Sequence, residues 1–136
     1  MITKFKIFEK KRDFDGTGTW SMWAELHRAI SFDDKPRFKE LIEMNPSIDE
    51  INGVIGSKEP NCDLLLMAAE YADYKNDDLY FVIELTKLGA DWFIKNDDGK
   101  YFLDYGNDNQ NEQLKKLFPD LYSKYLLRKE EEKYNL

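Results

Sequence analysis

A short apolar motif recurs three times along the 136 residues of this chain, and this recurrence restricts the folds that the chain can adopt. The copies are AELHRAI at 24–30, DLLLMAA at 63–69 and YFLDYG at 101–106. Their matching leucines, Leu26, Leu65 and Leu103, lie 39 and 38 residues apart. Each copy precedes a second apolar segment, so the repeating unit is predicted to be a pair of helices. A single pair cannot bury its own apolar face, and the pattern therefore predicts an all-α solenoid of stacked pairs.

Helical spacing within each unit supports this interpretation, because apolar residues recur at positions i, i+3 and i+4. They are Leu26, Ala29, Ile30, Phe38, Leu41 and Ile42 in the first unit, and Leu65, Ala68, Ala69, Ala72, Phe81, Val82, Leu85 and Leu88 in the second. Asp33 and Asp34 are expected to end the first helix and cap the second helix of the first pair, with Pro36 in its first turn. Asp63 is expected to cap the first helix of the second pair. Gly89 is placed to end that pair in a left-handed conformation.

The segments around the repeats divide the chain into three parts. Residues 1–19 are expected to form an N-terminal arm, 20–127 the repeat domain, and 128–136 a charged tail that frays. Loops or turns are predicted at 49–62, 96–99 and 106–111, which are rich in Gly, Asn and Asp. Pro119 interrupts the last apolar stripe, so it is expected to open a final helix that caps the solenoid.

The stretch LTKLGADWFIKNDDGK, residues 85–100, resembles the ankyrin repeat family. In that family a helix ending in Gly-Ala-Asp leads into an extended finger, a polar turn with Gly and a short helix. Gly89-Ala90-Asp91 and Gly99 match this order. Leu26 and His27, followed by Ala29, match the second half of the inner-helix signature T-P-L-H-x-A.

The resemblance covers about residues 20–118 and implies a protein-binding domain with one concave face, in which His27 hydrogen-bonds the neighbouring turn. The chain departs from the family in its repeat spacing, which exceeds the usual length of about 33 residues. Ser47-Ile48-Asp49 replaces Gly-Ala-Asp in the first unit, and the third unit has Gly106 where Ala is usual. A related helix-pair solenoid is therefore the alternative fold.

Charge favours one class of partner over another. The net charge is −7, with a local +3 in residues 1–13 and −10 in the remainder. Such a body repels nucleic-acid phosphates and attracts basic proteins, so we expect a basic protein partner and no direct contact with nucleic acid. The simpler alternative is that the negative charge only keeps the protein in solution.

Cysteine, histidine and hydropathy exclude several classes of site. With one Cys and one His the chain can form neither an internal disulfide nor a Cys/His metal cage. No stretch approaches the roughly 18 apolar residues of a membrane span. We therefore expect a cytoplasmic protein without membrane contact, metal or cofactor.

One motif suggests catalysis. Asp13 to Thr17, in the order D-x-D-G-T, resembles the loop of haloacid dehalogenase-type phosphatases, which would make Asp13 a nucleophile and, with Asp15, an Mg²⁺ ligand. That loop normally follows a buried strand, whereas here it follows the charged residues 9–12. There is no phosphate-binding glycine loop or nucleophile elbow, and the acidic turns lack the calcium spacing of an EF-hand. We therefore expect a non-enzymatic protein, with a small phosphatase as the minor alternative.

Aligning the repeats predicts which residues face a partner. The predicted partner-binding residues are Trp20, Trp23, Phe32, Glu59, Glu70, Tyr71, Asp97, Asp98, Lys100 and Asp108. Aromatic anchors within a polar rim are typical of a binding interface. The alternative is that the aromatic side chains are buried in loops. The leading hypothesis is an acidic inhibitor or immunity-type protein that covers a nuclease, toxin or nucleic-acid-binding complex, and a scaffold subunit is the alternative.

Overall fold

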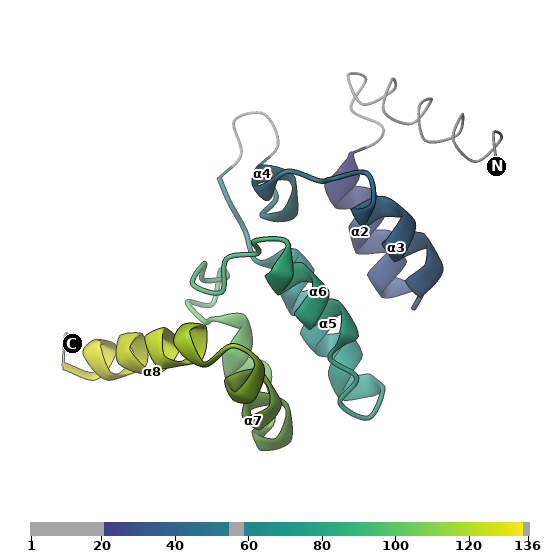
Figure 1. Cartoon of the computed structure of the whole chain (residues 1–136). Coiled ribbons are helices and arrows are strands. Elements are labelled where there is room, and N and C mark those ends of the chain that lie inside the picture. Colours follow the sequence, from purple (N-terminus) through teal and green to yellow (C-terminus); the bar gives the residue numbers. More distant parts are fainter. Residues whose placement is uncertain (1–20, 55–58, 135–136) are drawn as a thin grey trace, which may run out of the picture.

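The computed structural model describes residues 21–54 and 59–134, and these ranges contain helices and turns but no strand (Figure 1). This confirms the predicted all-α class. The elements are α2 (Met22–Ser31), α3 (Lys35–Ile42), α4 (Ile48–Ile51), α5 (Asp63–Tyr74), α6 (Tyr80–Lys87), the short 3₁₀ helix η2 (Phe102–Tyr105), α7 (Asp108–Leu117) and α8 (Pro119–Tyr134).

Local sequence explains where the first pair of helices begins. The Ser21 hydroxyl accepts a hydrogen bond from the backbone N–H of Ala24 at 3.0 Å and thereby caps α2. The Asp34 carboxylate does the same for Arg37 at 3.1 Å, and Pro36 lies in the first turn of α3. The start of α3 agrees with the sequence-based expectation, with Asp34 rather than Asp33 as the cap.

In the two complete helix pairs, a residue with positive φ follows each helix. A residue with positive φ follows α2 and α5, namely Asp33 (φ 54°) and Asn76 (φ 53°). Another follows α3 and α6, namely Asn45 (φ 56°) and Gly89 (φ 102°). Asp, Asn and Gly tolerate this left-handed conformation better than other residues. Left-handed residues close to the helix ends are thus common to both pairs.

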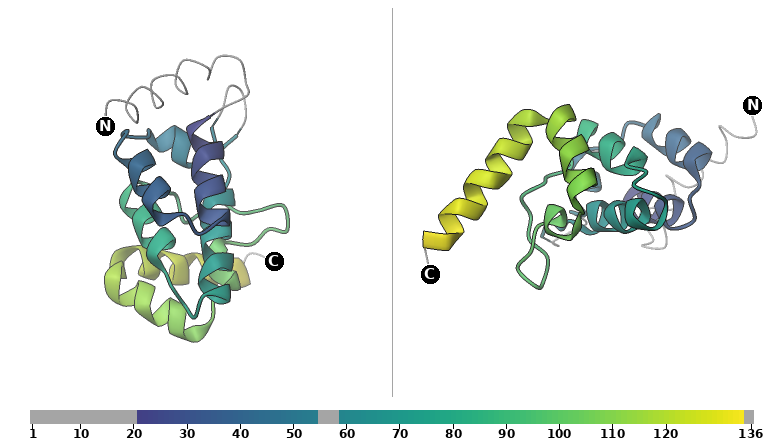
Figure 2. Two further views of the ribbon diagram at one scale, coloured as in Figure 1. Left: turned by 90° about the vertical axis from the view of Figure 1, so that its right-hand side faces the viewer. Right: turned by 90° about the horizontal axis from the view of Figure 1, so that it is seen from below.

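The helix pairs lie side by side in two layers (Figure 2). The inner layer consists of α2, α5 and η2, in which α5 contacts both neighbours, and α3, α6 and α7 form the outer layer. The three matched leucines, Leu26, Leu65 and Leu103, are all buried in one continuous apolar core between the layers. The repeated motif therefore marks the residues through which the inner layer packs.

Polar side chains also connect one unit to the next. The Asn52 amide donates to the carbonyl of Gly89 at 3.4 Å and accepts from the N–H of Asp91 at 2.9 Å. The Asp77 carboxylate accepts from the side-chain amides of Asn107 and Gln110, at 2.9 and 2.8 Å. These bonds satisfy polar groups at the turns that connect neighbouring units.

Two loop predictions require correction. The predicted loop at 49–62 contains the end of α4, because Ser47 and Glu50 form a reciprocal capping box at its start. The predicted turn at 106–111 is shorter than expected, because the Asn107 side chain caps α7 and the helix begins at Asp108. At α5, Cys62 rather than Asp63 occupies the cap position, and Asp63 is the first helical residue.

The C-terminal helix also differs from the prediction. As expected, α8 begins at Pro119, but it continues to Tyr134 instead of fraying after Leu127. Side chains in its second half find partners in the preceding unit. The Glu132 carboxylate accepts from the Tyr101 hydroxyl at 2.7 Å, and Lys129 lies 3.2 Å from the Asp104 carboxylate. These contacts hold the charged segment in helical form.

Candidate protein-binding groove

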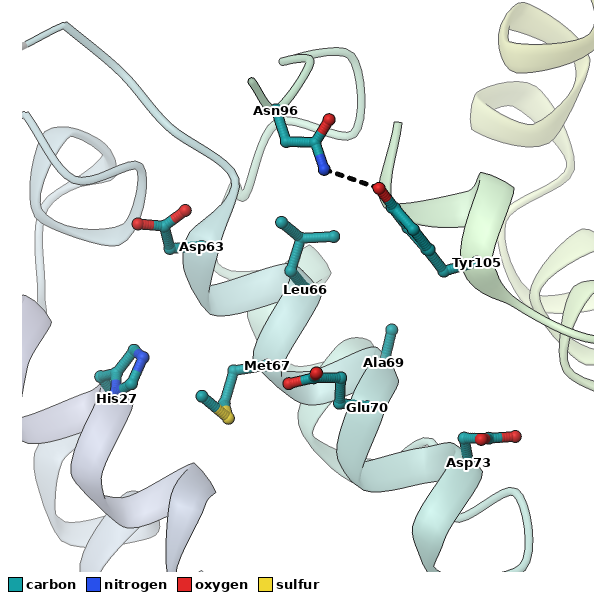
Figure 3. Close-up of a pocket in the computed structure, with 9 residues that line it drawn as sticks. All are labelled: His27, Asp63, Leu66, Met67, Ala69, Glu70, Asp73, Asn96 and Tyr105. Atoms are coloured by element: carbon teal, nitrogen blue, oxygen red, sulfur yellow. Dashed lines mark hydrogen bonds between the residues drawn. The ribbon is translucent and has the colours of Figure 1, made fainter. Parts of the chain in front are cut away.

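The inner helices leave a long concave surface, which we call the inner groove. It consists of two adjoining hollows with volumes of about 540 and 780 Å³ that share Met67, Glu70 and Asp73 on α5. The groove residues are His27, Ile30, Ser31, Phe32, Asp33, Asp63, Leu66, Met67, Ala69, Glu70, Tyr71, Asp73, Tyr74, Lys75, Asn96 and Tyr105. Figure 3 shows the first hollow, with α5 between His27 on one side and Asn96 and Tyr105 on the other.

Helical periodicity explains why α5 supplies most of this surface. Six of its groove residues, Asp63, Leu66, Met67, Glu70, Asp73 and Tyr74, follow one another at intervals of one or three positions. This spacing places them on one side of the helix. The buried Leu65, Ala68 and Ala72 lie on the opposite side and pack into the core. One helix therefore serves the core and the groove with different faces.

Large aromatic side chains are exposed in the groove. Phe32 is 75% exposed, Tyr74 82% and Tyr105 48%. The Tyr105 hydroxyl accepts a hydrogen bond from the Asn96 amide at 2.8 Å, and this bond holds the Tyr105 ring beside the turn that contains Asn96 (Figure 3). The alternative that Phe32 is buried in a loop is therefore wrong. Exposed aromatic groups gathered on a concave surface are the usual anchors of a protein interface.

The charges of the groove are mainly negative. Four carboxylates and one ammonium group line it: Asp33, Asp63, Glu70, Asp73 and Lys75. The Asp33 carboxylate forms an ion pair with the Lys75 ammonium group at 3.9 Å. Among the described residues, the side chains of the other three acids take part in no ion pair or hydrogen bond. These carboxylates are available to a cation.

Tyr71 lines the groove but also belongs to the core framework. Its hydroxyl donates to the Asp33 carboxylate at 2.7 Å, and its ring packs edge-to-face on Phe81 at 4.9 Å. Burial and the hydrogen bond to Asp33 raise the pKa of Tyr71 to about 12, so it is neutral at physiological pH. The bond to Asp33 joins the first two helix pairs, and the Phe81 contact lies within the second, so truncation of Tyr71 would affect folding as well as binding.

The other predicted residues are distributed unevenly. Trp23 is half-buried against the core, with its ring 5.2 Å from that of His27, and it lines a smaller hollow that shares His27 and Phe32 with the groove. Glu70 lies at the centre of the groove. The exposed residues Glu59, Asp97, Asp98, Lys100 and Asp108 lie outside it. Trp20, Asp13 and Asp15 lie outside the described residues.

His27 differs from the role that the family resemblance implies, and Cys62 is a buried thiol. Within the described part of the chain, the His27 imidazole makes no hydrogen bond to a turn, and its ring contact is with Trp23. Cys62 is buried, and burial together with the Asp63 carboxylate raises the pKa of its thiol. A raised pKa keeps the thiol protonated and therefore a poor nucleophile.

Metal-binding clusters and membrane-spanning helices are absent from the described part of the chain. Residues 21–54 and 59–134 contain no group of three or more His, Cys, Asp or Glu side chains arranged to hold a metal ion. In these ranges no helix combines the length and the apolar character needed to cross a bilayer.

Sequence reasoning missed several groove residues, chiefly Leu66, Met67, Asp73, Tyr74 and Tyr105. The signal for the first four was present, because they continue the helical stripe that runs through Glu70. Tyr105 carried no such signal, since its position depends on how η2 packs against α5.

Comparisons with family models, with curated proteins and with solved structures found no match to this chain. The resemblance to ankyrin repeats therefore rests on the residues quoted above. Function has to be argued from the groove itself.

Proposed function

We propose that this chain is a non-enzymatic protein-binding domain whose inner groove holds a segment of another protein. The observation that carries the proposal is that Phe32, Tyr74 and Tyr105 are exposed on the same concave surface as the carboxylates of Glu70 and Asp73. An exposed aromatic group costs free energy in water, and a protein partner would recover it by covering the ring.

The ankyrin-like interpretation supports the same location. The order of elements agrees with that family. Left-handed residues follow the helices of both pairs, and the second pair leads through the turn at Asn96–Lys100 into the short helix η2. Ankyrin-like domains bind partners through their inner helices and turn tips. We therefore assign binding to the inner layer rather than to the outer helices.

The narrower proposal is an acidic, cytoplasmic inhibitor or immunity-type protein that covers a basic target such as a nuclease, a toxin or a nucleic-acid-binding complex. The net charge of −7 and the carboxylates in the groove support a basic target. A scaffold subunit of a larger complex would use the same surface. The two roles differ in whether binding abolishes an activity of the partner.

Affinity capture from the native host tests the proposal with two matched variants. The groove variant carries Phe32→Ala and Tyr74→Ala, and the control carries Lys39→Ala and Lys87→Ala on exposed positions of the outer helices. We expect a partner identified by mass spectrometry to bind the control normally. Each groove substitution should weaken its binding by about 1–3 kcal/mol in a titration with the purified partner.

Loss of the partner in the outer-helix control, with normal capture by the groove variant, would contradict the proposal. Addition of the purified protein to the partner then separates the two roles. An inhibitor abolishes the partner's activity at equimolar concentration, whereas a scaffold leaves it unchanged. Mg²⁺-dependent phosphatase activity that disappears on replacing Asp13 and Asp15 by Asn would show an enzyme instead.

A further inference from the structure

We infer that the inner groove binds an arginine-bearing segment of the partner, with a guanidinium group seated between Glu70, Asp73 and the aromatic rings beside them. The inference rests on the proposed function and specifies the chemistry of its partner. Glu70 and Asp73 line both hollows, and Asp63 lies on the same face of α5. Like charges three positions apart on a helix repel one another, and a bound cation relieves that repulsion.

Some carboxylates outside the groove have cationic partners within the chain. Glu25 pairs with Arg37 at 3.1 Å, and Glu84 pairs with Lys87 at 3.6 Å. In the groove, only Asp33 has a cationic partner among the described residues. Among the described residues, the carboxylates of Asp63, Glu70 and Asp73 therefore have no cationic partner. They differ from exposed acids such as Glu43 and Asp120 in lining a concave surface that also carries aromatic rings.

The aromatic groups favour arginine over lysine. A guanidinium group is planar, so its face can stack on an aromatic ring while its N–H groups donate to two carboxylates. The protein uses both geometries internally. The guanidinium of Arg128 lies 4.7 Å from the centre of the Phe93 ring, and that of Arg37 donates to Glu25 and Glu40 at 3.1 and 3.4 Å.

The remaining groove surface sets the residues next to the arginine. Leu66 and Met67 are half-buried beside Glu70 and present apolar atoms to the first hollow. Methionine adapts its shape to different apolar partners. The complementary segment therefore alternates arginine with aliphatic side chains, so that cations meet the carboxylates and apolar groups cover Leu66 and Met67.

Fluorescence anisotropy with three labelled probes tests this inference on the full chain. The probes are a short peptide of alternating arginine and leucine, the same peptide with lysine for arginine, and the same peptide with the neutral isostere citrulline. We expect the arginine peptide to bind about tenfold more tightly than the citrulline peptide, and also more tightly than the lysine peptide.

Two variants with the same total charge then locate the site. Glu70→Gln with Asp73→Asn removes two groove carboxylates, whereas Glu43→Gln with Asp120→Asn removes two exposed carboxylates outside the groove. We expect the first pair to weaken binding of the arginine peptide about tenfold and the second pair less than about twofold. Circular dichroism spectra identical to wild type will show that all variants are folded.

Equal losses in the two variants would reduce the effect to net charge and overturn the inference. Equal binding of the lysine or citrulline peptide would overturn the assignment to arginine, and self-association of the chain through this face would assign the groove to a second copy. If partner capture still depends on Phe32 and Tyr74 in either case, the proposed function stands and only the chemistry of the occupant is wrong.

Discussion

Asp104 attaches α8 to the rest of the molecule. Its carboxylate accepts hydrogen bonds from the Tyr125 hydroxyl at 2.6 Å and from the Tyr101 backbone N–H at 2.9 Å, and it pairs with Lys129 at 3.2 Å. Burial alone would raise the pKa of Asp104, but these three partners outweigh burial and lower it. A single side chain thus joins η2 to residues in the middle of α8.

The lowered pKa of Asp104 makes stability depend on pH. The contribution is complete above the ordinary aspartate pKa of 3.8 and disappears as pH falls through the lower value in the folded protein. We expect Asp104→Asn to reduce the free energy of unfolding by about 1–3 kcal/mol at neutral pH, because a charged acceptor is lost. In urea titrations this difference should shrink below about pH 4.

Asp98→Asn in the exposed finger turn provides the control for Asp104, with little expected effect at any pH. A difference between wild type and Asp104→Asn that stays constant down to acid pH would mean that the carboxylate is not charged in the folded protein.

At the scale of the element, the end of α6 is defined by Gly89. Its N–H bonds to the carbonyl of Thr86 at 3.1 Å, and the N–H of Ala90 bonds to that of Leu85 at 3.0 Å. The second bond requires the left-handed φ of 102° at Gly89, which turns the Ala90 N–H back toward the helix. A Cβ atom added there would lie 3.1 Å from Cγ1 of Ile48, so the site is restricted by space as well as by conformation.

Gly89→Val should therefore destabilise the protein by on the order of 1 kcal/mol or more, through backbone strain and contact with α4. Gly99→Val is the matched control, because Gly99 also has a positive φ of 74° but no atom within 4 Å of an added Cβ. Chemical denaturation should show a larger loss for Gly89→Val. Equal losses would indicate that only the conformation matters and that Ile48 moves away freely.

At the scale of the whole molecule, stability depends on the packing of one helix pair against the next. Ala29 lies on the buried face of α2, which contacts both α3 and α5. A carboxylate at this position would be removed from water without a partner. We expect Ala29→Asp to cost at least about 2 kcal/mol and to lower the melting temperature of the entire chain.

The control for Ala29→Asp is Ala24→Asp, which places the same charge on an exposed position in the first turn of α2. An acid near a helix N-terminus interacts favourably with the helix dipole, so this variant should melt close to wild type. Melting followed by circular dichroism and by fluorescence of the buried Trp92 should coincide in both variants. Normal stability of Ala29→Asp would show that α2 is not packed as described.

Much of the fold could be predicted from the chain alone, because the relevant interactions are local. Asp34 with Pro36, the apolar spacing of α2 and α5, and Gly89 each act within a few residues of the backbone they shape. The stripe of α5 that contains Glu70 was also visible in the sequence, as a second face opposite the buried one.

Only the tertiary structure decided which of these residues form the groove. Whether a helical stripe faces a neighbour or solvent depends on how the pairs stack, and stacking is a property of distant segments. The packing of η2 against α5 thus places Tyr105 in the same hollow as Leu66, and the Tyr71 hydroxyl of the second helix pair reaches Asp33 of the first. The charged end of α8 is helical for the same reason, since Glu132 is held by Tyr101, 31 residues earlier in the chain. Local periodicity determines the helices, whereas contacts between units determine which of their side chains remain free to bind.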